Sequence, residues 1–224
     1  MQVAGLGAYT LFDNLLFAEL SFYRSAQQGA ANPADSTSTM AIKGVAPYWR
    51  LALQHQWSST YLEVGTFGMA PKQYINGTSG NMDNFTDLGF DFQLEHSLPF
   101  GQLTFHSSLI NEKEQRDESS TQHNNLNFDS FKIDGNLYFK KGIGTTIGYF
   151  NSSGSEDGAV GSYTGKPNSN GMLFQLEYLP WYNTKFIAQY TAYAKFDGSS
   201  TNYDSLGRNA KNNNTLFLMV WLNF

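Results

Sequence analysis

The chain has 224 residues, a length that fits one domain or at most two. Charged residues make up 15% of the chain and aromatic residues 16%, whereas an average soluble domain is about 25% charged. The absence of cysteine excludes disulfides, thiolate metal sites and covalent haem attachment, and the formal net charge of −5 without a visible basic patch argues against nucleic-acid binding.

The N-terminal residues, Met1 to Gly5, contain no basic segment followed by an apolar one, so no signal peptide is visible. No apolar run reaches the roughly 20 residues that a helix needs to cross a bilayer. An exported protein carries a signal peptide, so we expect the sequence to be a mature form or a fragment.

Alternation of polar and apolar residues predicts about eleven β-strands, the first over Val3 to Phe12. The others are expected at Leu15 to Arg24, Pro47 to Trp57, Tyr61 to Met69, Asp87 to Glu95, Gln102 to Glu112, Phe131 to Phe139, Thr145 to Phe150, Met172 to Tyr178, Phe186 to Asp197 and Thr215 to Phe224. Glycines inside them, such as Gly65, Gly68 and Gly89, indicate bends or close packing.

Tight turns and longer loops are expected to alternate between these strands. The turns lie near Asp13-Asn14, Ser58-Ser59, Pro99 to Gly101, Gly142 and Trp181 to Thr184. The longer loops, rich in Gly, Ser, Asn and Asp, run roughly over Gln27 to Thr39, Asn76 to Asn84, Glu118 to Asn125, Ser152 to Gly171 and Ser199 to Asn213. Short turns at one rim and long loops at the other are typical of an outer-membrane barrel.

The last predicted strand carries one apolar face made of alternate residues. These are Leu216, Leu218, Val220, Leu222 and Phe224. A terminal Phe after such alternation resembles the C-terminal signature by which bacterial outer-membrane β-barrels, a porin-like family, are recognised for assembly. The resemblance implies that these five residues form an assembly signal, and that the outer-membrane assembly machinery and the lipid bilayer are partners.

These patterns predict one all-β domain over residues 1–224, an antiparallel up-and-down transmembrane β-barrel of about 10–12 strands in the bacterial outer membrane. In this predicted barrel the periplasmic turns are short and the extracellular loops are longer. Because single-chain barrels have an even number of strands, a strand before Val3 is expected to be missing from a barrel of twelve or more strands; a ten-strand barrel is the alternative. The rival fold is a soluble sandwich, lipocalin-like barrel or jelly roll, which would bury the apolar faces inward.

If the apolar faces meet lipid, the polar faces line a lumen with eight acidic and three basic residues. The lumen or constriction candidates are Glu19, Arg50, Glu63, Asp87, Asp91, Glu95, Glu112, Lys132, Asp134, Glu177 and Lys195. An open pore with this lining favours cations. Alternatively, the charges pair across the barrel and close it, since only barrels of about sixteen strands reliably leave wide channels.

The densest acidic group is Asp87, Asp91 and Glu95 on one predicted strand, facing Glu63 and Arg50 if sequential hairpins pair. Such a group predicts either a constriction or divalent-ion site, or an arginine-braced structural network. The segment from Asn81 to Asn84 in the adjacent predicted loop offers oxygen ligands but lacks the spacing of a calcium loop.

The catalytic and cofactor interpretations have little support in the sequence. His106 and Ser108 share one face, and His123 lies in a loop near Asp117 and Glu118, but neither group has the partners of a hydrolase. No two histidines have metal-ligand spacing on one strand, and no haem, flavin or nucleotide motif is present. We therefore predict no enzymatic activity, no metal site and no cofactor.

Three strings, Tyr48 to Leu53, Leu62 to Met69 and Phe85 to Asp91, resemble segments of uncharacterised outer-membrane barrels associated with multihaem cytochrome proteins. The resemblance implies a non-conducting scaffold or sheath for an electron-transfer or other partner protein. The leading hypothesis is a passive pore for small solutes or ions, and an outer-membrane hydrolase is the third.

Overall fold

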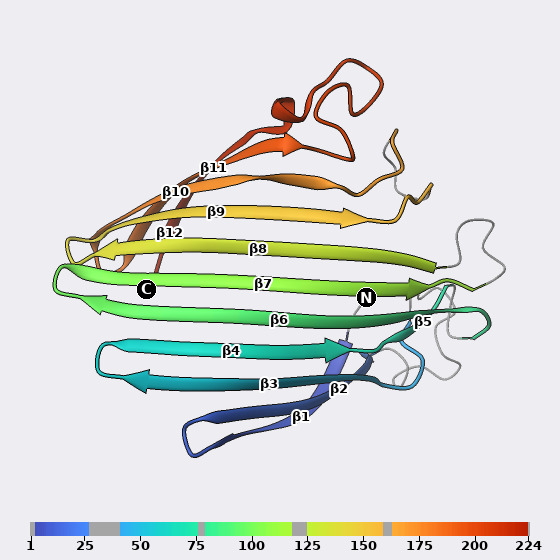
Figure 1. The fold of residues 1–224 in the computed structure, drawn as a ribbon, viewed down its shortest axis with the longest axis horizontal. Helices are drawn as coiled ribbons and strands as arrows, with labels where there is room; N and C mark the ends of the chain where they lie inside the picture. Colours follow the sequence, from blue (N-terminus) through green and yellow to red (C-terminus); the bar gives the residue numbers. More distant parts are fainter. Residues whose placement is uncertain (1–2, 27–40, 76–78, 118–124, 159–162, 224) are drawn as a thin grey trace. The chain divides into compact units, whose positions relative to one another are not determined.

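The structure is a computed structural model that describes residues 3–26, 41–75, 79–117, 125–158 and 163–223. Its strands form one antiparallel sheet in which neighbours in sequence are neighbours in space, except that the short β5 pairs with β6 off the main path. The strands, labelled in Figure 1, are β1 (Val3–Phe12), β2 (Leu16–Ser25), β3 (Ala46–Trp57), β4 (Thr60–Met69), β5 (Lys72–Tyr74), β6 (Met82–Leu98), β7 (Gly101–Gln115), β8 (Asn125–Phe139), β9 (Ile143–Gly154), β10 (Ser169–Trp181), β11 (Thr184–Lys195) and β12 (Thr215–Leu222).

This arrangement confirms the all-β class and the antiparallel up-and-down order. The first predicted strand has the bounds of β1, and each predicted turn connects the two strands of an observed hairpin. The prediction was wrong at Asn76 to Asn84, because residues 82–84 begin β6. They are held in the sheet by pairing with β5, where Lys72 lies opposite Asn84 and Tyr74 opposite Met82.

The short turns have the backbone conformations that their residues tolerate. Asp13 and Asn14 both have positive φ, 52° and 51°, in the turn between β1 and β2. Short polar side chains are the ones that adopt this left-handed region most readily. Gly142 has φ 80°, and a Cβ there would overlap the carbonyl oxygen of Leu179, so only glycine fits.

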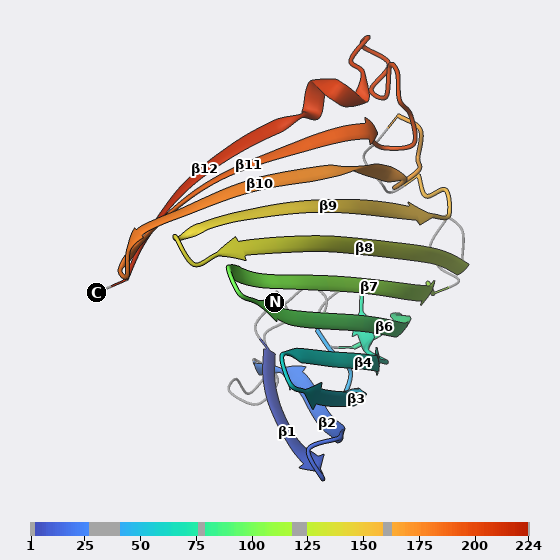
Figure 2. The same cartoon turned by 60° about the vertical axis from the view of Figure 1, so that its left-hand side comes forward.

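Two compact units are distinguished along the chain. The first comprises Met1–Gln54, Val64–Phe90 and Ile110–Phe128, and the second comprises His55–Glu63, Asp91–Leu109 and Asp129–Phe224. In the first unit β2 pairs with β1 on one side and β3 on the other. In the second, β10 lies between β9 and β11, as Figures 1 and 2 both show, and β11 pairs with β12.

Few apolar side chains of the described residues are buried. The buried ones are mostly small, such as Ala41, Ala46 and Ala52, and no large side chain in the described part is completely buried. Many large apolar residues on the strands are exposed instead, for example Leu6 at 82% and Leu218 at 69%. The described sheet therefore has no conventional hydrophobic core of large side chains.

Aromatic rings pack against glycines on neighbouring strands. The Phe67 ring occupies the space where a Cβ of Gly89 would lie, and the Trp49 indole lies similarly against Gly68. Glycine lets a ring lie flat across the adjacent strand. The predicted close packing at Gly68 and Gly89 is confirmed.

No helix in the described part of the chain has the length and apolar character needed to cross a membrane. Ala210–Asn213 form a short 3-10 helix, η2, in the connection between β11 and β12.

Candidate functional site: the polar face of the sheet

The register of the second unit separates an apolar face from a polar one. On one face Phe174 of β10 lies opposite Tyr190 of β11 and Ile147 of β9. One position along, Gln175 lies opposite Gln189 on the other face. Because side chains alternate along each strand, this register aligns the apolar residues of neighbouring strands.

An ion pair on the polar face joins Glu177 of β10 to Lys185 of β11. Lys185 Nζ lies 2.5 Å from Glu177 Oε2, and Gln175 Nε2 donates to Glu177 Oε1 at 2.5 Å. Glu177 is only 9% exposed. Glu177 was a predicted lumen residue and Lys185 was not. The register of β10 and β11 has an irregularity between Tyr178 and Trp181, and beyond it odd positions of β10 lie opposite odd positions of β11.

Two further acidic candidates of the second unit accept hydrogen bonds from neutral side chains. Gln93 and Gln102 donate to the two carboxylate oxygens of Glu95, at 2.6 and 2.9 Å. The Tyr61 hydroxyl donates to Glu63 Oε2 at 2.6 Å. These amide and hydroxyl donors stabilise the two carboxylates by hydrogen bonding.

Asp134 lies against His106, with Asp134 Oδ2 3.3 Å from His106 Nδ1. Asp134 and Lys132 also line a cavity of about 230 Å³ together with Gln175 and Gln189. His106 therefore has a carboxylate partner on a neighbouring strand, which fits a hydrogen-bonding role on the polar face. The remaining basic candidate of this unit, Lys195, is at the end of β11 and in register with Asn170.

In the first unit, Arg50 of β3 is in register with Glu19 of β2. Ser21 Oγ donates to Glu19 Oε1 at 2.8 Å, and the Arg50 guanidinium carbon lies 6.0 Å from the centre of the Phe67 ring. Arg50 was predicted to face Glu63 and the acidic group of Asp87, Asp91 and Glu95. That placement stays a prediction, and the register adds Glu19 as a neighbour on β2.

Asp87 of β6 and Glu112 of β7 bring two carboxyl groups into side-chain contact. The Oδ1 atom of Asp87 is shielded from solvent and has no hydrogen-bond partner. Asp87 was predicted to group with Asp91 and Glu95 because they share a strand. Counting back from the observed two-residue turn Pro99-Phe100 places position 87 opposite position 112, whereas the predicted turn, Pro99 to Gly101, gives a different register.

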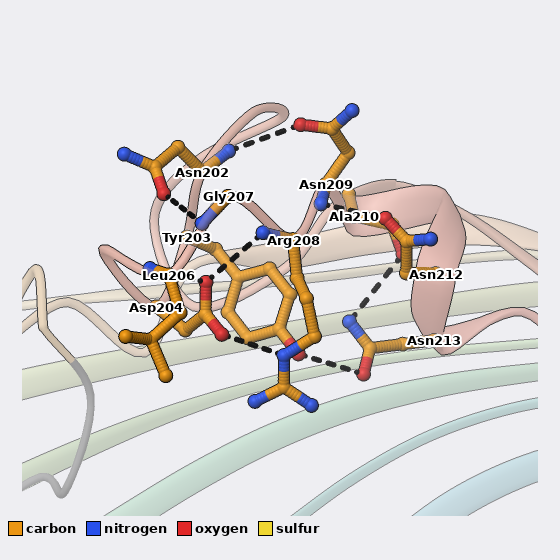
Figure 3. A network of polar contacts seen from close by, with 10 residues as sticks. All are labelled: Asn202, Tyr203, Asp204, Leu206, Gly207, Arg208, Asn209, Ala210, Asn212 and Asn213. Atoms are coloured by element: carbon orange, nitrogen blue, oxygen red, sulfur yellow. Dashed lines mark hydrogen bonds and ion pairs between the residues drawn. The ribbon is translucent and has the colours of Figure 1, made fainter.

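The connection between β11 and β12 is held by its own polar side chains (Figure 3). Arg208 Nε donates to Asp204 Oδ2 at 2.5 Å, and the guanidinium carbon of Arg208 lies 5.4 Å from the centre of the Tyr203 ring. Hydrogen bonds from Arg208 lower the pKa of Asp204 below its ordinary value. The Tyr203 hydroxyl donates to Asn213 Oδ1 at 3.1 Å. The polar composition of this predicted loop is explained by these internal bonds.

Four residues of the predicted assembly signal, Leu216, Leu218, Val220 and Leu222, are exposed on β12. They are in register with alternate residues of β11, including Tyr190, Ala188 and Phe186. They thus continue the apolar face of β10 and β11. Phe224, the fifth residue of the signal, and His123 lie outside the described residues.

No group of three or more His, Asp or Glu side chains in the described ranges is arranged to hold a metal ion. Comparison with models of known protein families finds no match, and comparison with curated proteins finds none either.

Proposed function

We propose that the chain is a porin-like β-barrel of the bacterial outer membrane, a passive pore for small ions or solutes whose lumen mildly favours cations. The observation that carries this proposal is the division of the sheet into two faces. Exposed apolar side chains of β9 to β12 share one side, and Glu177, with its lysine and amide partners, lies on the other side of β10.

The apolar face is unfavourable in water and favourable in lipid. Each Å² of apolar surface removed from water contributes roughly 25 cal/mol, and a contiguous exposed patch above a few hundred Å² marks an interaction surface. A bilayer covers such a face without a second protein layer. In a spanning sheet every backbone polar group must also be paired, which closure of the sheet into a barrel achieves.

The polar face supplies the lining of the proposed pore. Eight of its eleven candidate residues are acidic, and Glu95 accepts hydrogen bonds from two neutral amides. Lys185 offsets one carboxylate, Glu177. The remaining candidate residues have a net negative formal charge, and this charge attracts cations into a narrow aqueous path.

The first test refolds the chain in detergent micelles and compares the gel migration of boiled and unboiled samples. A heat-modifiable, detergent-dependent β-protein is expected. A monodisperse folded protein in plain buffer would refute the membrane location and support a soluble sandwich or barrel.

The second test measures reversal potentials across planar bilayers in a salt gradient. We expect a cation preference that falls when Asp87 and Asp91 are replaced by Asn and Glu95 by Gln. An unchanged reversal potential would show that this strand does not line the constriction. A correctly inserted protein without conductance would favour the scaffold or sheath function instead.

A further inference from the structure

A cavity of about 560 Å³ lies entirely within the first unit. Apolar and aromatic side chains make most of its wall, among them Tyr23, Tyr48, Met69 and Phe85, and two carboxyl groups, Asp87 and Glu112, also line it. Its volume is in the range of roughly 300–1,000 Å³ found for small-molecule sites. A mostly apolar wall with a few polar groups is also the usual composition of such sites.

Backbone hydrogen bonds fix one wall of this cavity. Ile42, which is 3% exposed, lines it, and its backbone nitrogen donates to Ser25 Oγ at 2.8 Å. The next backbone nitrogen, of Lys43, donates to the carbonyl oxygen of Lys72 at 2.8 Å, and that of Tyr74 donates to Ala41 at 2.9 Å. Residues 41–43 are thus attached to both β2 and β5. The cavity wall is therefore built into the fold.

Within the described residues, no positively charged group is found to act on either carboxyl group, Asp87 or Glu112. They contact each other, and Asp87 Oδ1 is shielded without a hydrogen-bond partner. Adjacent carboxylates repel each other, and a cation between them relieves the repulsion.

The remaining lining selects the kind of cation. Calcium takes 6–8 oxygen ligands, more than two carboxyl groups and one glutamine in an apolar wall provide. A primary ammonium group needs acceptors for only three N–H donors and can carry an apolar body. The Tyr23 and Tyr48 rings, 6.5 Å apart and edge to face, offer that body an aromatic wall and can contribute cation–π attraction.

We propose that this cavity binds an amphipathic organic cation, with a primary ammonium group between Asp87 and Glu112 and an apolar body against Tyr23, Tyr48 and Phe85. The site depends on the geometry of the first unit and not on the membrane location. The binding assay can therefore fail while the conductance assay succeeds, and binding can be found in a protein that does not conduct.

The test titrates the folded full chain in dodecylmaltoside micelles with 2-phenylethylammonium by calorimetry. We expect saturable one-to-one binding that is about tenfold or more tighter than binding of 2-phenylethanol, which lacks the charge. Combined replacement Asp87→Asn and Glu112→Gln should remove this advantage and leave 2-phenylethanol binding unchanged. Equal binding of the two probes, or no saturable binding, would overturn the proposal.

Two controls separate the site from general charge effects. The pair Asp91→Asn and Glu95→Gln removes the same charge at positions outside the cavity wall and should leave probe binding unchanged. Met69→Trp should fill the cavity and abolish binding while both carboxyl groups remain. Retained binding in Met69→Trp, or displacement of the probe by millimolar Ca²⁺, would refute the organic-cation site.

Discussion

Replacement of Lys185 by Met removes a cation that is bonded to a nearly buried carboxylate on the polar face of the second unit. Glu177 is 9% exposed and its Oε2 lies 2.5 Å from Lys185 Nζ. Removing one partner of a fully buried pair costs about 3–5 kcal/mol. The Lys185 side chain is 33% exposed, so solvent screens part of the interaction, and we expect a loss of about 1–3 kcal/mol in the free energy of unfolding.

A double-mutant cycle measured by urea unfolding in detergent separates this pair from its surroundings. Lys185→Met, Glu177→Gln and the double variant should give a coupling energy of about 1–2 kcal/mol. Lys166→Met is the matched control, since Lys166 Nζ is 3.8 Å from Glu156 Oε2 and both side chains are about half exposed or more. The control should change stability by about 0.5 kcal/mol or less.

A coupling energy below about 0.5 kcal/mol would refute this reasoning, because a pair at hydrogen-bond distance on a shielded face is expected to exceed that value. It would mean that water screens Glu177 and Lys185 separately. The polar face would then be more hydrated around β10 and β11 than the 9% exposure of Glu177 implies.

Two other substitutions test the sheet and its apolar face by urea unfolding. Gly171→Ala should lower the free energy of unfolding by about 1–3 kcal/mol, because the new Cβ would overlap the carbonyl oxygen of Ala192. Gly148→Ala should lower it less, because the nearest neighbours of a Cβ at that position are 3.3 Å away. Equal effects of the two substitutions would refute the close approach at Gly171. In lipid vesicles, Phe174→Arg should lower the free energy of unfolding by about 2–4 kcal/mol, and Gln189→Arg on the opposite face should lower it far less. Similar losses for the two variants would contradict a lipid-facing apolar side.

The strands and their faces could be predicted because their signal is local. Alternation with period two decides which residues share a face, and the turn at Asp13 and Asn14 is marked by residues that tolerate positive φ. The faces of β10 and β11 follow from this pattern, but their register does not, because an irregularity between Tyr178 and Trp181 shifts it by one residue from the pairing at the two-residue turn. Because each strand pairs with the next one in the sequence, apart from β5, the strand order follows directly from the order of the hairpins.

The elements that were missed depend on contacts between distant segments. β5 has three residues, too few for any period to be visible, and it is held by pairing with β6 and by hydrogen bonds to residues 41–43. The partners of the charged candidates were missed for a related reason, because each comes from a neighbouring strand. Lys185 and Glu112 required the register of a hairpin, which the strand pattern alone does not specify.

The partners observed on the polar face change how its charge should be counted. The eleven candidates have a formal charge of −5 from eight acids and three bases, but Lys185 offsets Glu177 within the second unit. Asp87 and Glu112 differ from the other acidic candidates, because their carboxyl groups contact each other and Asp87 Oδ1 has no hydrogen-bond partner. If the polar face lines a pore, two carboxyl groups in contact favour a shared proton over two full charges, so Asp87 and Glu112 should contribute less to cation preference than Glu95, whose carboxylate accepts hydrogen bonds from two amides.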